Sequence, residues 1–427
     1  MPEGAEILRF TRALERWGFR ATPPFHIEPP IGDAKQLARL FTSRSGELSR
    51  AILPLFNGRN ILVRGMLGVG KSAFILRLLH ELDAQAKIAK DRLRPIYIYH
   101  FYGGTTEDFY RLITLTLAQI LSDKDQEALN VLDALQGWKI TSSRSRGVGA
   151  KFGVQLMEMA KAEIGLETKE ETKREVASFN PYDLLERFVE QAYKRFGRLV
   201  IAVDDLDKSK PENLRLVQAM LQGALPLLRN NRIGFILTGI TLPLAHLAAY
   251  DLYGAMLGLF DETVQLNVLL PEELREIARK TLGLVRKVEQ ASPLPFHEDA
   301  LVAAAARSHG IPRLFNIICA KLLEQAVLQD IDFIDGVAFT RCYEAIQARI
   351  SATVTPQMRS ILSVAKNYGG FSSDMSDDAL DKLGMTTFVE LIPMADYLVA
   401  NDLMVRQEYE GGVRYAVADI AEKAAES

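Results

Sequence analysis

The sequence predicts an α/β fold, in which a parallel sheet is followed by a helical segment and then by a small domain of helices and a hairpin. Three observations predict it. A glycine-rich loop, "GMLGVGKS" at residues 65–72, lies between a short apolar run and an amphipathic stretch. Apolar runs alternate with helix-like stretches up to about residue 270, as in a sheet covered on both faces. After Pro271 the apolar residues recur at helical spacing, and a Gly-Gly turn follows near the end.

The composition is that of an ordinary globular protein. The chain has 427 residues, enough for two or three domains, with 48% hydrophobic and 25% charged residues. Its net charge of −3 gives no general attraction for nucleic acid. No apolar run reaches the length of a membrane span, and the first residues lack the features of a signal peptide. We therefore expect a cytoplasmic protein with no membrane partner, in which Cys319 and Cys342 are buried thiols.

The glycine-rich loop has the pattern G-x-x-x-x-G-K-[ST], with Gly65, Gly70, Lys71 and Ser72 at the fixed positions. A loop that wraps around a di- or triphosphate aims successive main-chain N–H groups inward, which requires glycine, and the helix that follows favours anions at its N-terminus. Lys71 is expected to reach the β- and γ-phosphates, and the Ser72 hydroxyl to hold Mg²⁺. The expected cofactors are ATP or ADP with Mg²⁺. The amides expected around the phosphates are those of Gly65, Leu67, Gly68, Val69, Gly70 and Lys71.

The flanking residues agree with this interpretation. "NILVR" at 60–64 reads as a buried strand, and 71–82 as a helix, so the loop joins a strand to a helix. A Gly-rich turn in some other α/β protein is the alternative. A second strand is expected within 94–104 and a helix at 106–121. Residues 137–178 are rich in charges and show no strong period, which predicts an exposed insertion or a partner-binding loop.

Carboxylates follow the next buried strand. In "RLVIAVDDLDKS" at 198–209, five apolar residues lead to Asp204 and Asp205. The carboxyl ends of strands are where open α/β sheets place ligands, so we expect Asp204 to hold Mg²⁺ and Asp205 to polarise an attacking water. An Asx turn or a helix cap is the alternative. The next strand, in 232–241, ends in Thr238, which would orient the water or sense the γ-phosphate, or else bond to the main chain. A last strand is expected at 262–269.

Four helices are predicted from Pro271 to about residue 350. Arg313, in "HGIPRLFN", opens one of them and would fold back over the phosphates, unless it forms a surface salt bridge. Residues 351–427 then predict three short helices and a hairpin that turns at residues 410–412, which is the plan of a winged helix. The expected domains are a lead-in at 1–45, a nucleotide-binding core at 46–270 that contains the insertion, a helical lid at 271–350, and the winged helix.

With these motifs in this order, the sequence resembles the AAA+ ATPases. In particular it resembles the branch of origin-recognition and replication-initiator ATPases, transposition-helper ATPases and STAND signalling ATPases. "LFTSRSGELSRAIL" at 40–53 is similar to the G-R-x-x-E-L motif of that branch, with Arg44 and Glu47 in place but Ser43 at the family's glycine. The resemblance implies a P-loop NTPase core, a helical lid, a sensor role for Thr238, and an adenine pocket that includes residues 27–30.

Two departures from the family pattern bear on turnover. Most AAA+ proteins have Asp-Glu where this chain has Asp204-Asp205, and the shorter side chain should hold the water less well. Hydrolysing AAA+ rings also supply an arginine from a neighbouring subunit, yet no Arg or Lys occurs from Ile233 through Leu274. We therefore expect slow hydrolysis, with Arg229 and Arg232 as the substitute arginines.

The charges argue against DNA binding by the winged helix. Residues 351–427 hold six basic and twelve acidic residues, a net charge of −6, and "TTFVELIPMADYLVAND" at 386–402 has no basic residue. We expect a nucleotide-controlled switch that governs self-association into a homo-oligomer or the engagement of an effector protein, as in a bacterial defence system or a mobile element. The alternative is a DNA-binding replication-initiator or transposition-helper ATPase, with DNA contacts through Arg144, Arg146 and Lys151. A third possibility is a nucleotide-binding scaffold without turnover.

Overall fold

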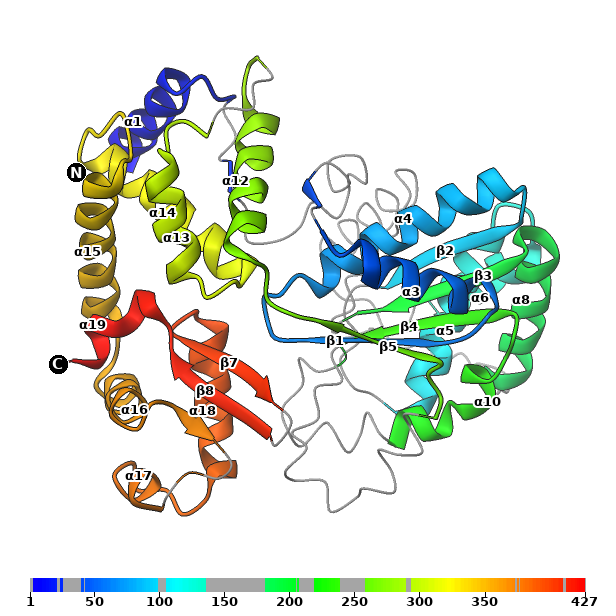
Figure 1. Ribbon diagram of the computed structural model, residues 1–427. Helices are drawn as coiled ribbons and strands as arrows, with labels where there is room; N and C mark the ends of the chain where they lie inside the picture. Colours follow the sequence, from blue (N-terminus) through cyan, green and yellow to red (C-terminus); the bar gives the residue numbers. More distant parts are fainter. Residues whose placement is uncertain are drawn as a thin grey trace, which may run out of the picture.

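The computed structural model shows two parts, a sheet with its flanking helices and a second part built from helices and a small sheet (Figure 1). It describes residues 3–20, 24–25, 40–41, 43–98, 105–135, 181–204, 206, 219–238, 258–288, 293–372, 375, 377–409 and 412–426. The predicted insertion at 137–178 lies outside these residues. Within the described part of the chain, no helix is long and apolar enough to cross a bilayer.

The first part is built on a five-stranded sheet whose strands are all parallel, in the order β2-β3-β4-β1-β5. This confirms the predicted fold class. The strands are β1 (Ile61–Gly65), β2 (Leu93–Ile98), β3 (Arg198–Val203), β4 (Ile233–Thr238) and β5 (Glu262–Leu266). The strands β1, β3 and β4 are buried along almost their whole length, because helices cover both faces of the sheet.

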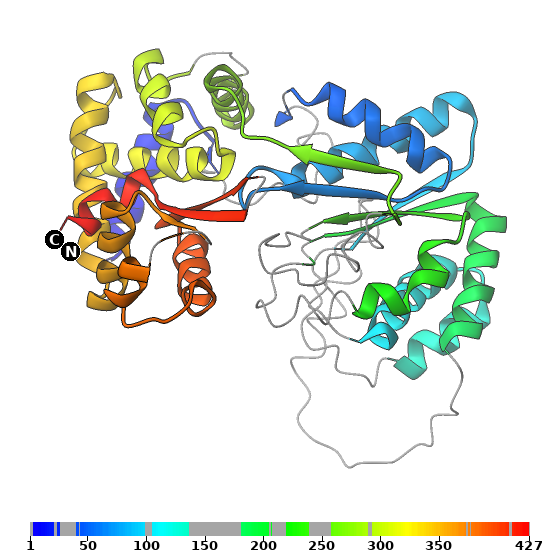
Figure 2. The ribbon, with the colours of Figure 1, turned by 60° about the horizontal axis from the view of Figure 1, so that its bottom comes forward.

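Each face of the sheet has its own hydrophobic cluster, because successive side chains along a strand point to opposite faces. Figure 2 shows α3 (Ser45–Phe56) and α4 (Lys71–Ala89) on one side of the sheet. The other side carries α5 (Thr106–Leu121), α6 (Gln126–Leu135), α8 (Pro181–Phe196) and α10 (Leu225–Leu228). The helix expected at 71–82 is therefore present, and it continues for two further turns.

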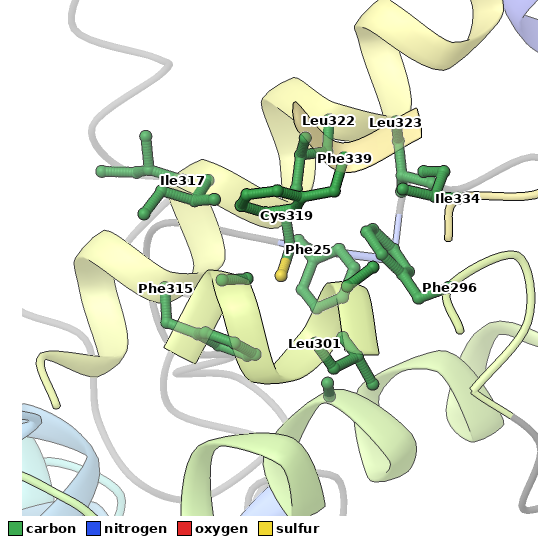
Figure 3. Close-up of a cluster of buried hydrophobic side chains, with 14 of the residues drawn as sticks. Phe25, Phe296, Leu301, Phe315, Ile317, Cys319, Leu322, Leu323, Ile334 and Phe339 are labelled. Atoms are coloured by element: carbon green, nitrogen blue, oxygen red, sulfur yellow. The ribbon is translucent and has the colours of Figure 1, made fainter. Parts of the chain in front are cut away.

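The four helices predicted after Pro271 are present, although the last runs to Thr353. They are α12 (Pro271–Val285), α13 (Glu298–Arg307), α14 (Pro312–Leu328) and α15 (Gly336–Thr353). Two of them begin with proline at the first helical position, where the missing N–H is not needed. Their apolar faces form a shared core, and Figure 3 shows Cys319 of α14 inside it among phenylalanine, leucine and isoleucine side chains.

The N-terminal segment belongs to this helical part. We expected residues 1–45 to be a lead-in, but α1 (Glu3–Arg16) packs against α14. Trp17 Nε1 donates a hydrogen bond to the carbonyl of Asp332 at 2.9 Å, and Phe25 meets the ring of Phe296 edge-on. The helical core therefore contains the beginning of the chain as well as residues 271–350.

The C-terminal segment contains the three helices and the hairpin that were predicted, together with a short strand, a 3₁₀ turn and a short final helix. Gly412, expected in the turn, is instead the first residue of β8 and pairs with Tyr409. The elements are α16 (Pro356–Asn367), β6 (Phe371–Ser372), α17 (Asp377–Asp381), α18 (Phe388–Ala400), β7 (Met404–Tyr409), β8 (Gly412–Val417), the 3₁₀ turn η3 (Asp419–Ala421) and α19 (Glu422–Ala425). A fourth hydrophobic cluster holds them together.

Candidate functional site

The predicted site residues come together at the edge of the sheet where the carboxyl ends of the strands meet. The glycine-rich loop follows β1, Asp204 follows β3, and Thr238 is the last residue of β4. Because β4 lies between β1 and β3, Thr238 stands between the loop and Asp204. The strand order alone therefore brings together three features that lie far apart in the sequence.

The loop directs the chain into α4 through glycines with left-handed main-chain angles. Gly70 caps α4 at φ +98°, and Gly68 has φ +80°. The start of α4 has no side-chain cap and no acidic residue in its first turn. Its first main-chain N–H groups therefore receive no such side-chain partner, which is the condition for binding an anion at a helix N-terminus.

Lys71 carries a buried positive charge in this loop. Its side chain is 9% exposed, and Nζ donates to the carbonyls of Gly65 at 2.7 Å and Met66 at 3.4 Å. Within the described part of the chain no carboxylate forms an ion pair with it. A buried ammonium group next to an uncapped helix N-terminus fits a phosphate anion. Ser72, the next residue, is half-buried in the first turn of α4.

Asp204 is completely buried, and its carboxylate accepts a hydroxyl hydrogen bond from each neighbouring strand. Thr238 Oγ1 donates to Oδ1, and Tyr97 of β2 donates its hydroxyl to Oδ2 at 2.7 Å. With the hydroxyl of Ser72, the site offers the oxygen donors that Mg²⁺ prefers. The sequence reasoning missed Tyr97, because only the strand order of the folded sheet places it beside Asp204.

Arg44 connects the loop to the end of β5. It precedes α3 with φ +62°, and its buried guanidinium donates to the carbonyls of Val69 at 3.1 Å and Asn267 at 2.8 Å. Burial lowers the pKa of Arg44, and the nearby Glu47 and Glu273 oppose that shift. Arg44 and Glu47, picked out by resemblance, are therefore placed behind the loop, where Arg44 supports its main chain.

Arg313 lies at the junction of all three segments. Its main-chain N–H donates to the carbonyl of Gly68 at 3.2 Å, so the start of α14 rests on the loop. Its side chain turns toward the C-terminal segment, where Nε is 3.2 Å from Asp402 Oδ1. Within the described residues, Nη2 makes two long hydrogen bonds, to Asp402 Oδ2 at 3.5 Å and to the carbonyl of Ala400 at 3.4 Å. Nε itself is not aligned for a hydrogen bond, so the contact with Asp402 is mainly ionic.

Asp402, the partner of this arginine, is partly desolvated and has a left-handed main-chain conformation. It is a non-glycine residue with φ +61°, and its side chain is 26% exposed. Desolvation raises the pKa of Asp402, and the positive charges of Arg313 and Lys321 only partly oppose that shift. The ion pair therefore does not fully compensate for the loss of hydration, which makes it a contact of small net stability.

The remaining predicted residues lie elsewhere. Arg229 and Arg232 stand at the start of β4, at the opposite end of that strand from Thr238, and Arg232 lies over the ring of Tyr193. Asp205, the proposed adenine-pocket residues 27–30, and the basic residues Arg144, Arg146 and Lys151 fall outside the described residues.

With the loop, the buried lysine and the strand-end carboxylate in place, a comparison with known families decides what this part of the chain is. The model of the family described as "AAA ATPase domain" matches residues 41–230. Residues 41–230 are an AAA ATPase domain. The glycine-rich loop and the strands β1, β2 and β3 lie within this AAA ATPase domain, whereas β4 and β5 lie beyond the matched residues.

Solved structures also align with the chain beyond the AAA ATPase domain. Orc1 of Aeropyrum pernix, solved in complex with DNA, is 13% identical over 92% of this chain and 95% of that chain, with a TM-score of 0.45. Orc2 of the same organism is 13% identical over 90% of this chain and 93% of that chain, with a TM-score of 0.47. The RuvB branch-migration motor of Thermotoga maritima is 14% identical over 90% of this chain and 95% of that chain, with a TM-score of 0.42. At these low scores the likeness carries no argument about function. No curated protein matches the chain.

Proposed function

We propose that this protein is an ATP-binding, Mg²⁺-dependent and slowly hydrolysing AAA+ switch. Its nucleotide state would control self-assembly or the engagement of an effector protein. We assign the protein to the origin-recognition and STAND-like branch of AAA+ ATPases, which its sequence resembles. The observation that carries it is the double attachment of Arg313, which touches the P-loop through its main chain and the C-terminal segment through its side chain.

The attachment links nucleotide binding to the arrangement of the segments. The side chain of Arg313 is held by long hydrogen bonds and by an aspartate whose charge is poorly compensated. A phosphate beside the P-loop would be a stronger partner for a guanidinium than Asp402 is. Binding of ATP would thus draw Arg313 away from Asp402 and release the C-terminal segment from α14. That release is the conformational output of the proposed switch.

The residues at the sheet edge have separate roles in the proposed hydrolysis. Lys71 and the loop amides hold the phosphates, and Ser72 with Asp204 would hold Mg²⁺, which supplies charge stabilisation at the transferring phosphate. Thr238 orients the Asp204 carboxylate through its hydroxyl. Asp205 is proposed to accept a hydrogen bond from the attacking water. Arg313 would add a positive charge only after it leaves Asp402.

We expect slow turnover because no Arg or Lys occurs from Ile233 through Leu274, where a catalytic arginine would normally come from. Arg229 and Arg232 stand at the other end of β4, about 20 Å away at the rise of an extended strand, so they cannot act on the nucleotide of their own subunit. Either of them would act only on a neighbouring subunit. Completion of the site between subunits would make hydrolysis depend on assembly.

The C-terminal segment fits the role of a protein-binding module. Its order of helix, strand, two helices and hairpin supports its assignment as a winged helix at about 351–427, after a lid at 271–350. The core at 46–270 precedes the lid, and α1 packs on the lid. The predicted recognition helix, α18, carries Glu390 and Asp396 and no basic residue, so its partner would be a protein surface.

The test is ATP turnover per protomer across a hundredfold range of protein concentration, with Lys71→Ala as the blank. A rate per protomer that rises with concentration supports a site completed in trans, and Arg229→Ala and Arg232→Ala then identify the arginine. A flat, slow rate supports a self-contained switch. Turnover no higher than that of Lys71→Ala, or no loss of turnover when Mg²⁺ is chelated, contradicts the proposal.

The alternative function is a DNA-dependent ATPase of the replication-initiator or transposition-helper kind. The net charge of −6 over residues 351–427 disfavours it. Adding duplex DNA to the same assay separates the two. Stimulation of turnover that fades as salt is raised would favour the DNA-dependent ATPase, because phosphate contacts weaken steeply with salt.

A further inference from the structure

Tyr97 lies on the edge strand β2, which β3 and β4 separate from β1 and the P-loop. Its side chain nevertheless projects from the same face of the sheet as the site residues. The register pairs Tyr97 with Ala202 on β3, and Ala202 with Ile236 on β4. Two residues further along these strands come Asp204 and Thr238, so all three polar side chains project from the face that α4 covers. Tyr97 is 1% exposed, and this arrangement points its hydroxyl along the sheet toward the carboxylate.

The Asp204 carboxylate accepts hydrogen bonds from hydroxyl groups on both neighbouring strands. Tyr97 donates to Oδ2 from β2 at 2.7 Å, and Thr238 donates to Oδ1 from β4. The main-chain N–H of Asp204 also donates to the carbonyl of Ile98 at 3.0 Å. The last torsion of an aspartate side chain is broad when nothing holds it, so one hydroxyl on each oxygen is needed to fix the plane of the carboxylate. A side chain fixed in this way needs no rearrangement when a charged ligand arrives.

We propose that Tyr97 is a positioning residue of the Mg²⁺ site: it fixes the Asp204 carboxylate from the side opposite Thr238. This inference rests on the proposed function, in which Asp204 helps to hold Mg²⁺. β3 and β4 separate the Tyr97 strand from β1, the strand that leads into the P-loop. The Tyr97 hydroxyl would therefore act on the nucleotide through its hydrogen bond to Asp204.

The geometry separates two contributions to nucleotide affinity. The hydrogen bonds of Lys71 within the described residues go to Gly65 and Met66, and Tyr97→Phe removes only a hydroxyl, so we expect the contacts of the P-loop with the phosphates to persist in this variant. The part of the affinity that Mg²⁺ adds depends on the orientation of Asp204, so it falls in Tyr97→Phe. A role limited to packing would affect both parts alike or neither.

The experiment measures the affinity of the full chain for a fluorescent ATP analogue in Mg²⁺ and in EDTA. For Tyr97→Phe we expect an affinity in EDTA within about twofold of the wild type. We expect the gain from Mg²⁺ to fall by about tenfold, equivalent to about 1.4 kcal/mol, and the Mg²⁺ titration midpoint to move to higher concentration. Thr238→Val, which removes the hydroxyl on the other oxygen, should show the same split.

The matched control is Tyr343→Phe, which removes a buried tyrosine hydroxyl from α15 in the helical part. It should leave both affinities unchanged. If Tyr97→Phe keeps the full gain from Mg²⁺, or loses affinity in EDTA to the same extent, the positioning role is overturned. If the wild type itself gains nothing from Mg²⁺, the proposed Mg²⁺ site fails, and the role of Tyr97 fails with it.

Discussion

At the scale of single residues, the contact between Arg313 and Asp402 has poor hydrogen-bond geometry and only partly compensates for the desolvation of Asp402. Among the residues that the structure describes, the hydrogen bonds of the Arg313 side chain are long, at 3.4 and 3.5 Å, and Asp402 is partly buried in a left-handed conformation. A strong surface pair would instead be short and bidentate. The pair is therefore suited to exchange rather than to permanent attachment.

Replacing Asp402 with asparagine should tighten ATP binding. The neutral amide removes the charge that competes for Arg313, and we expect affinity to rise by about three- to tenfold, equivalent to roughly 1 kcal/mol. Calorimetric titration of ATP into Asp402→Asn and the wild type measures this. The matched control is Asp419→Asn, which breaks the 2.6 Å pair between Arg307 and Asp419, another link between the helical and C-terminal parts. Equal affinities in all three proteins would contradict the exchange.

The raised pKa of Asp402 predicts how its contribution to stability changes with pH. The folded state binds the Asp402 proton more tightly than the unfolded state does, because burial raises this pKa and Arg313 and Lys321 only partly oppose the shift. Stability from this group therefore increases as pH falls from neutral through the raised pKa toward the ordinary aspartate range, and is lost as pH rises. Asp402→Asn cannot titrate at this position. As the pH is lowered from neutral toward the ordinary aspartate range, the melting temperature of the wild type should therefore rise relative to that of Asp402→Asn.

At the scale of elements, the bounds of α5 and the start of α12 were predictable from the sequence. The helix expected at 106–121 is α5 with the same bounds, because Thr105 and Asp108 cap it reciprocally. The predicted start of α12 at Pro271 also holds, since Glu273 accepts a hydrogen bond from the main chain of Leu270 at 2.7 Å. Cap residues act within four positions of one another, so the sequence displays them directly.

The elements that were missed depend on partners distant in the sequence. Residues 3–16 have no clear cap, and α1 gains its stability from α14, some 300 residues later. The strand β6 has only two residues and exists through pairing with β8. Tyr97 and Asp402 had no local signal either, because their roles arise from the strand order and from the docking of one segment on another. Tertiary contacts of this kind leave little trace in local periodicity.

The packing of α1 predicts a measurable contribution to the stability of the helical part. Leu14 is 2% exposed within that core, so Leu14→Ala should reduce the free energy of unfolding by about 2–5 kcal/mol. The neighbouring Glu15 is exposed, and Glu15→Ala should change it by less than about 0.5 kcal/mol. Chemical denaturation followed by circular dichroism measures both. Similar values for the two variants would mean that α1 is not part of the core.

The contact between the P-loop and α14 predicts that Gly68 accepts no side chain. A Cβ at Gly68 would lie 2.9 Å from Cβ of Arg313, and its φ of +80° strains any L-residue. Gly68→Ala should therefore push α14 from the loop and weaken ATP binding by about tenfold or more. Gly46→Ala is the control, because a Cβ there meets nothing within 4 Å. Unchanged ATP affinity in Gly68→Ala would show that the docking of α14 is irrelevant to the nucleotide.

At the scale of the whole molecule, the proposed switch predicts that assembly follows the nucleotide. Sedimentation velocity of the wild type should show a larger species, or a complex with its effector, in ATP and Mg²⁺ than in ADP. Lys71→Ala should sediment identically in both, because its P-loop lacks the charge that holds the phosphates. Asp402→Asn should reach the larger species at lower ATP concentration. A sedimentation profile that is independent of nucleotide in the wild type would leave ATP binding without the proposed output.

The sequence predicted the sheet, its parallel strands and the P-loop, because each rests on local patterns of apolar residues and glycines. It did not predict how the three segments meet. Arg313 and Asp402 are 89 positions apart, and their contact depends on the path of α14, α15 and the C-terminal segment between them. The motif order predicted the candidate site residues, whereas the contact between Arg313 and Asp402 appears only in the three-dimensional arrangement.

The interior placement of both cysteines has a practical consequence. Cys319 and Cys342 are the chain's two cysteines, both are fully buried, and burial raises the pKa of each thiol. Thiolate is the reactive form, so maleimide reagents should ignore the folded wild type. New cysteines could then be placed on the exposed surface of α13 and on α18 without removing either native thiol. Dyes attached to them would report the distance between the helical part and the C-terminal segment. The rate at which Cys319 is labelled would in turn report how often the helical core opens.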